Sequence, residues 1–301
     1  MARVEERIDV GFGPSPAAEV WARPRPRRGL ARLPWASFFI IAVLILVAVL
    51  APLIAPHSPT EQSRPDKLLP PAWQEGGSTK HLLGTDVLGR DVLSRIIYGA
   101  RVSLIVAAAA LLAGGGVGLM VGIVSGYLGG RVDGFLMRVV DATLTFPTIL
   151  IALLLAVGLG QGLQTIAITV LIWARFARVV RGEVLAVKTR DFVALAQVHG
   201  CSHLRIMAIH IVPNVLNTFM VLLTLHIGFV IIVEASLSFL GAGIPPPTPS
   251  WGQMVADGRS HIASAWWLSV VPGAAIMLVV LAFNLFGDWL RDWLDPRLRQ
   301  V

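Results

Sequence analysis

The chain has 301 residues, of which 55% are hydrophobic and 14% are charged, and its mean hydropathy is +0.73. Soluble domains carry about 25% charged residues, so this composition excludes an ordinary water-soluble globular protein and favours one integral membrane unit. The net charge is +7, and the single cysteine, Cys201, excludes an internal disulfide and a multi-cysteine metal site.

Apolar runs long enough to cross a bilayer as helices recur along the chain. Residues 1–34, which precede the first run, are rich in Arg and Pro, and we expect them to be disordered at least in part. The first run exceeds the apolar core of a signal peptide and no clear cleavage site follows it, so we expect it to stay in the protein. The predicted fold is an all-α, polytopic membrane protein with six transmembrane helices, at 35–54 and near 102–126, 139–159, 163–181, 215–239 and 268–287.

Lys and Arg orient these predicted helices. They are more numerous in the segments that face the cytoplasm when the N-terminus is cytoplasmic, which predicts that both termini lie inside. The same argument explains the net positive charge of the chain, so we do not expect nucleic acid as a partner. We therefore divide the chain into a cytoplasmic N-terminal segment 1–34, the first helix with an extracytoplasmic connection 35–100, a five-helix core 101–290 with a cytoplasmic loop 183–213, and a cytoplasmic tail 291–301.

Glycine recurs every four residues on the second predicted helix. This spacing makes one smooth helix face, which another backbone can approach closely. We expect tight helix packing there rather than ligand binding. The glycines are Gly114, Gly118, Gly122 and Gly126.

Proline and ionisable residues mark the third and fifth predicted helices. Pro147 predicts a kink, which could be a hinge or only a feature of shape. His226 and Glu234 are eight residues apart and so lie on nearby faces of one helix. An ionisable residue within the membrane is a functional candidate. The pair could line a translocation path or satisfy a neighbouring helix, and the sequence leaves both open.

The sequence has no motif for ATP binding or hydrolysis. A P-loop ends in Gly-Lys-Ser/Thr, but Val187 precedes Lys188, the one lysine that Thr or Ser follows. No His-Glu-x-x-His helix and no Gly-x-Ser-x-Gly elbow occurs either, so we do not expect an enzyme. His81, Asp86 and Asp91 could suggest a metal site, but their spacing is not diagnostic and we expect none.

The sequence of the predicted cytoplasmic loop indicates two short amphipathic helices. Thr189 or Asp191 can cap the first, and Gly200 fits the position after its end, where a positive φ costs glycine little. Ser202 can cap the second, and Pro213 precedes the next predicted span, within reach of its first turn. The hairpin could lie on the lipid surface, or its first helix could dock into a groove of a soluble partner, and spacing leaves both open.

This loop resembles the coupling loop of bacterial ABC importer permeases, written Glu-Ala-Ala, three residues, Gly, nine residues, Ile-x-Leu-Pro. Ala194, Leu195 and Ala196 occupy the first three positions, so the Glu is replaced, while Gly200 and Pro213 match. Three further segments are similar to the second, C-type permease of the dipeptide, oligopeptide and nickel family: HLLGTDVLGRDVLSRIIYGARVSL at 81–104, EASLSFLGAGIPPPTPSWGQM at 234–254 and NLFGDWLRDWLDPR at 284–297.

The resemblance implies an ABC type I importer permease fold in a bacterial cytoplasmic membrane. It implies a homologous second permease, two cytoplasmic ATPase subunits or domains that bind ATP and Mg²⁺, and an extracytoplasmic substrate-binding protein, with no cofactor in this chain. The implied cargo is a di- or oligopeptide, with nickel, haem or another small solute as the alternative. The alternative from a different class of protein is a stand-alone secondary transporter or channel. The residues implied in ATPase coupling through 189–213 are Asp191, Phe192, Ala194, Leu195, Ala196, Gly200, Ser202 and Pro213.

Overall fold

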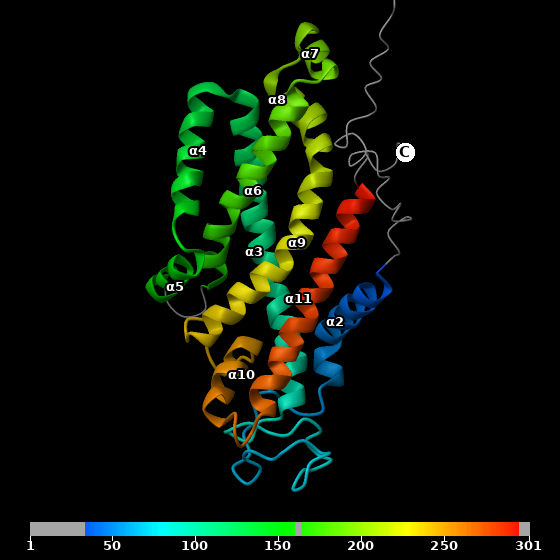
Figure 1. Ribbon diagram of the computed structural model, residues 1–301, viewed down its shortest axis with the longest axis vertical. Coiled ribbons are helices and arrows are strands. Elements are labelled where there is room, and N and C mark those ends of the chain that lie inside the picture. Colours follow the sequence, from blue (N-terminus) through cyan, green and yellow to red (C-terminus); the bar gives the residue numbers. More distant parts are fainter. Residues whose placement is uncertain (1–33, 160–163, 295–301) are drawn as a thin grey trace, which may run out of the picture. The chain divides into compact units, whose positions relative to one another are not determined.

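Helices supply the regular secondary structure of residues 34–159 and 164–294, which are the part of the chain that the computed structural model describes (Figure 1). These residues belong to one compact unit that begins at Pro34. Within them, the one bridge of β type joins Thr85 and Asp91. The predicted N-terminal segment, apart from Pro34, and the predicted tail from residue 295 onward lie outside the described residues.

Longer connections separate α2 from α3, at residues 55–91, and α9 from α10, at residues 240–250. Their bounds are α2 Trp35–Ile54, α3 Val92–Leu128, α4 Gly130–Thr145, α5 Thr148–Leu159, α6 Gln164–Lys188, α7 Asp191–Val198, α8 His203–Arg205, the π-helix η1 Ile206–Ile211, α9 Val212–Phe239, α10 Trp251–Gly258, the 3₁₀ helix η2 Arg259–His261 and α11 Trp267–Leu294.

Four helices of the described residues are long and apolar enough to cross a membrane, or five if the bent pair α4 and α5 counts as one span. The four are α2, α3, the continuous run His203–Phe239 and α11. The first predicted span coincides with α2. The fourth falls largely on α6, which is not among the four and carries Arg175, Arg178 and Arg181. Six spans therefore stay a prediction.

The third predicted span, 139–159, is wrong as a single helix. The chain breaks between α4 and α5, and the two helices bend by 91°. Pro147 has no N–H and pushes the residue before it out of the helical region, and Phe146 is indeed extended, with φ −86° and ψ 147°. The proline therefore ends one helix and starts another, which is a larger change than the predicted kink.

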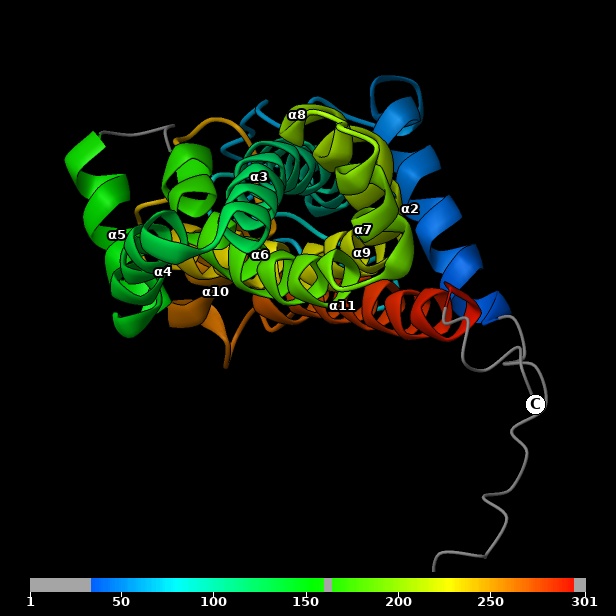
Figure 2. The same ribbon diagram turned by 90° about the horizontal axis from the view of Figure 1, so that it is seen from above.

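The glycine face of α3 lies against α6, which runs beside it (Figure 2). A Cβ atom at any of the four predicted positions would come closer than 3.0 Å to an α6 side chain. The pairs keep the four-residue spacing on both helices: Gly114 with Ile172, Gly118 with Phe176, Gly122 with Val180 and Gly126 with Val184. Glycine thus lets the two backbones approach and fixes the register between α3 and α6.

The remaining helices flank this pair. α9 packs against α3, α6 and α11, and α2 packs against α3 and α11. Figure 2 shows α2 on one side of this group and α4 and α5 on the other. The hairpin of α7 and α8 lies at one end of the helices and the connection 55–91 at the other (Figure 1).

Candidate docking loop

The loop begins where α6 ends, and α7 starts with Arg190 as its N-cap residue. Neither predicted cap is correct. The Thr189 hydroxyl donates to the Ala186 carbonyl of α6 at 3.0 Å, and Asp191 lies inside the first turn of α7. A carboxylate in that turn still interacts favourably with the positive end of the helix.

The turn after α7 is set by Gly200 and Ser202, as the sequence predicts. Gly200 has φ +74°, its N–H bonds the Gln197 carbonyl, and the Cys201 N–H bonds the Ala196 carbonyl, which together form a Schellman motif. Ser202 caps α8 by accepting from the Arg205 N–H at 3.4 Å. The second predicted helix is not a separate piece, because α8, η1 and α9 run on as one helix over His203–Phe239. Pro213 lies in the first turn of α9.

α7 has one buried face and one exposed apolar face. Val193 and Ala196 are 1% and 8% exposed and belong to the main apolar core. On the other face, Phe192 is 39% and Leu195 58% exposed, and Ala194 is exposed with them. Val198, at the end of α7, and Leu204 in α8 extend the exposed apolar surface. We call Phe192, Leu195, Val198 and Leu204 the apolar surface of the loop.

Polar contacts tie the loop to α3 and α6. The buried Tyr127, near the end of α3, bonds through its hydroxyl to Nδ1 of His203 at 3.0 Å. Lys188, the last residue of α6, donates to the Tyr127 carbonyl at 2.5 Å and lies over the Tyr127 ring. A displacement of α8 would therefore be transmitted to the ends of two long helices.

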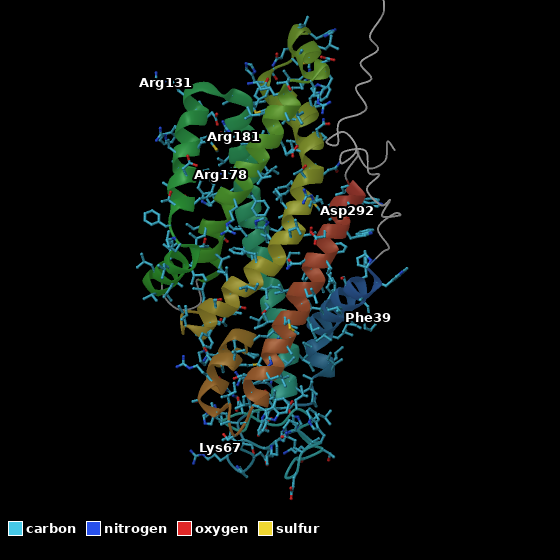
Figure 3. All side chains as sticks on the ribbon, viewed as in Figure 1. Phe39, Lys67, Arg131, Arg178, Arg181 and Asp292 are labelled. Atoms are coloured by element: carbon cyan, nitrogen blue, oxygen red, sulfur yellow. The ribbon has the colours of Figure 1, made fainter. Side chains whose placement is uncertain are left out.

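Ion pairs join α6 to α4 beside the loop. The Arg181 guanidinium bonds both oxygens of Asp133, at 2.6 Å each, and Arg178 pairs with Asp141. Figure 3 shows Arg178 and Arg181 between α4 and α6, with Arg131 near the start of α4 and Lys67 at the opposite end, in the connection. α4 is thereby linked by charge to the helix that leads into the loop.

The two ionisable residues of α9 have different partners. Glu234 is 1% exposed and accepts from the Ser238 hydroxyl at 2.8 Å and from the Ser103 hydroxyl of α3 at 3.4 Å. His226 bonds through Nδ1 to the Leu222 carbonyl at 2.8 Å, with its ring 4.9 Å from that of Phe176. Glu234 thus accepts a hydrogen bond from a neighbouring helix, α3. A place on a translocation path stays a prediction for both residues.

The opposite end of the helices holds buried charges. Asp86 is 3% exposed and pairs with Arg90, whose Nε lies 2.6 Å away, and with Arg95. Burial disfavours the carboxylate, but Arg95, Arg90 and two backbone N–H donors outweigh that effect, so the pKa of Asp86 lies below its ordinary value. Asp257 of α10 lies 3.7 Å from Arg90 and links the connection to the second half of the chain.

Comparisons with known proteins give a consistent result over nearly the whole chain. Residues 118–300 match the family described as binding-protein-dependent transport system inner membrane component. Residues 31–71 match the N-terminal transmembrane domain of oligopeptide transport permease C.

Full-length relatives agree with these matches. The chain is 41% identical to the dipeptide transport system permease protein DppC of Haemophilus influenzae, over 96% of this chain and 98% of that protein. It is 43% identical to the protein of the same name from Escherichia coli, over 100% of each, and 38% identical to the di/tripeptide transport system permease protein DppC of Pseudomonas aeruginosa, over 96% and 94%.

Proposed function

This chain belongs to the family of binding-protein-dependent transport system inner membrane components, and we propose that it forms half of the translocation path of an ATP-driven peptide importer. The names of its relatives, which are dipeptide and di/tripeptide permeases, support peptides as the cargo. In the same scheme an extracytoplasmic binding protein delivers the peptide, and a homologous second permease completes the path. His226 and Glu234 are our candidates for residues that line it.

The observation that supports coupling most strongly is the exposed apolar surface of the loop on a well-anchored helix. Phe192 and Leu195 project from α7, while Val193 holds the other face of the helix in the core. A short helix of this kind fits a groove of a partner protein. We assign that groove to a cytoplasmic ATPase, which also binds ATP and Mg²⁺, so that this chain is not itself an enzyme.

The proposed mechanism transmits motion from the ATPase to the spans. When the ATPase closes, it moves α7, and the bond between His203 and Tyr127 carries the movement to α3. The continuous run from His203 to Phe239 carries it into α9 without an intervening loop. Rocking of packed helices then changes which side of the membrane has access to the path.

The proposal places the loop in the cytoplasm of a bacterial cell and the connection 55–91 outside. In this arrangement six spans cross the cytoplasmic membrane and both termini lie inside. Four of the spans are the long apolar helices, the bent pair α4 and α5 is the fifth, and α6 is the sixth. The family's Glu is replaced by Ala194, so docking rests on Phe192, Leu195 and the Gly200 turn rather than on a carboxylate.

Replacement of Gly200 tests the coupling role. A Cβ atom at Gly200 would meet no atom of a more distant residue within 4 Å, so the main cost expected for Gly200→Val is its positive φ, at about 1–2 kcal/mol. Gly241, with φ +81° and equally open surroundings, provides the matched control after α9. We expect Gly200→Val to abolish peptide uptake in proteoliposomes while ATP hydrolysis continues, and Gly241→Val to retain uptake. Normal uptake by Gly200→Val at normal protein level would refute the coupling role.

Co-purification separates this function from that of a stand-alone secondary transporter or channel. We expect a second permease and two ATPase subunits or domains to purify with the chain. Nickel, haem or another small solute as the cargo would be favoured instead if the binding protein of the same transporter failed to bind peptides.

A further inference from the structure

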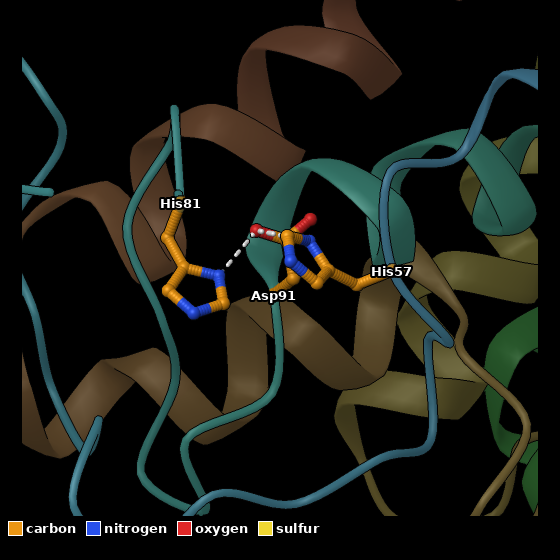
Figure 4. A group of neighbouring side chains, drawn as sticks. All are labelled: His57, His81 and Asp91. Carbon is orange, nitrogen blue, oxygen red and sulfur yellow. Dashed lines mark hydrogen bonds and ion pairs between the residues drawn. The ribbon is translucent and has the colours of Figure 1, made fainter. Parts of the chain in front are cut away.

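Three side chains of the kinds that bind metal ions converge at the start of α3 (Figure 4). His57 follows α2, His81 lies in the connection, and Asp91 is the N-cap residue of α3. One ligand atom from each lies within 4.8 Å of the others. His81 Nδ1 is 2.9 Å and His57 Nδ1 is 3.9 Å from the same oxygen, Oδ1 of Asp91.

These atoms are withdrawn from water, and one of them lacks a partner. The side chains of His81 and Asp91 are 5% and 1% exposed, and that of His57 is 25% exposed. His57 Nδ1 is nevertheless buried and has no hydrogen-bond partner. A buried polar atom without a partner is uncommon and requires an explanation, such as an ion that the atom binds.

A second layer of hydrogen bonds orients the carboxylate. Oδ2 of Asp91 accepts from the Ser94 N–H at 2.8 Å and from the Ser94 hydroxyl at 2.7 Å. The Ser94 hydroxyl also accepts a hydrogen bond from the backbone N–H of His57 at 3.0 Å. Oδ2 is thus occupied, and Oδ1 is left to face the two imidazoles. Supporting bonds of this kind hold the ligands of metal sites in place.

We propose that His57, His81 and Asp91 bind a divalent transition-metal ion, with Zn²⁺ as the best match. Two imidazoles and a carboxylate are a common zinc ligand set. Ligand atoms at about 2.1 Å from a tetrahedral zinc lie about 3.4 Å apart, and the two distances to Oδ1, 2.9 and 3.9 Å, bracket that value. The ion joins the end of α2 to the start of α3 and so fixes both ends of the connection. This proposal differs from the sequence-based expectation of no metal.

The test measures metal binding directly and needs no transport activity. The full-length chain, in detergent with any subunits that accompany it, is stripped with chelator, dialysed against Zn²⁺ and analysed by mass spectrometry. We expect about one Zn²⁺ per chain. We also expect at least tenfold weaker binding in His81→Ala, and a melting temperature that rises with Zn²⁺ but not with Mg²⁺. His261→Ala, which removes a histidine outside the cluster, should bind like the wild type.

A second variant, Asp91→Asn, keeps the test valid if His81→Ala fails to fold. Asparagine caps helices as well as aspartate does, so α3 keeps its start while the site loses its charge. We expect this variant to fold and to bind Zn²⁺ at least tenfold more weakly. A wild-type chain that binds no Zn²⁺, or that binds it no better than Asp91→Asn, would overturn the proposal and leave the three residues as a hydrogen-bonded helix cap. Neither result bears on the proposed transport function.

Discussion

The connection 55–91 and the loop 189–213 lie at opposite ends of the described helices and differ in how they place their charged and apolar side chains. In the connection, charged groups are buried and paired, as with Asp86, Arg90 and Arg95. In the loop, apolar groups such as Leu195 and Val198 are exposed. Burying a charge is costly unless it has partners, and exposing a cluster of apolar side chains forgoes the free energy of burial.

The difference shows where the partners of each group of side chains are found. The buried Asp86 of the connection finds its partners within this chain, and Asp257 of α10 lies near the same two arginines, so ion pairs join the connection to α3 and α10. The loop keeps its backbone anchored but leaves an apolar surface that only another molecule can bury. Exposed apolar clusters of this kind mark interaction sites.

The largest effect should come from breaking the buried charge cluster. Asp86→Ala leaves Arg90 and Arg95 buried without their main partner, and we expect a loss of about 3–5 kcal/mol of stability. Thermal unfolding of the purified protein measures it. Asp66→Ala, which removes a more exposed carboxylate from the same connection, should leave the melting temperature nearly unchanged. Equal shifts in the two variants would contradict the distinction between buried and exposed charges.

The exposed face of α7 should respond in the opposite manner. Phe192→Ser with Leu195→Ser should change the stability by no more than about 0.5 kcal/mol, since neither side chain is in the core. The same variant should lower peptide uptake about tenfold, because two apolar contacts with the partner are lost.

Val193→Ala provides the comparison from the buried face. It should lower stability by about 1–3 kcal/mol, because it leaves a cavity in the core. Its uptake, corrected for the amount of folded protein, should stay near that of the wild type. If the double serine variant transports normally, the exposed face is not a docking surface.

A smaller effect should follow from loosening the link between loop and core. Tyr127→Phe removes the hydroxyl that bonds His203 and should cost about 1 kcal/mol. Hydrogen exchange of the amides around α8 should become faster in this variant. Tyr98→Phe, at the other end of α3, should leave those amides unchanged, and similar rates in both variants would show that the bond does not anchor the loop.

Local signals made part of this structure predictable. The apolar run at 35–54 coincides with α2, and the Gly200 and Ser202 turn follows from residue types that favour those backbone positions. Pro147 marked a disturbance but not its size, because a proline can kink or end a helix depending on its neighbours.

Contacts between distant residues were not predictable. His57 was missed because it lies far in sequence from His81 and Asp91, with no motif to connect them. The ion pair of Asp86 with Arg95 was not predicted either, because it forms only when the connection meets the start of α3. The N-cap of α7 falls on Arg190, which makes no capping hydrogen bond with its side chain, so side-chain preference does not locate it.

The central claim is that the apolar surface of the loop binds a cytoplasmic ATPase, and crosslinking tests it most directly. A photoreactive amino acid at Leu195, in the chain expressed in its native membrane, should form an adduct with the ATPase subunit. The same group at Leu53, a leucine on α2 that is 82% exposed against 58% for Leu195, should not form that adduct. Lipid adducts alone at Leu195, or the same products at both positions, would contradict the claim.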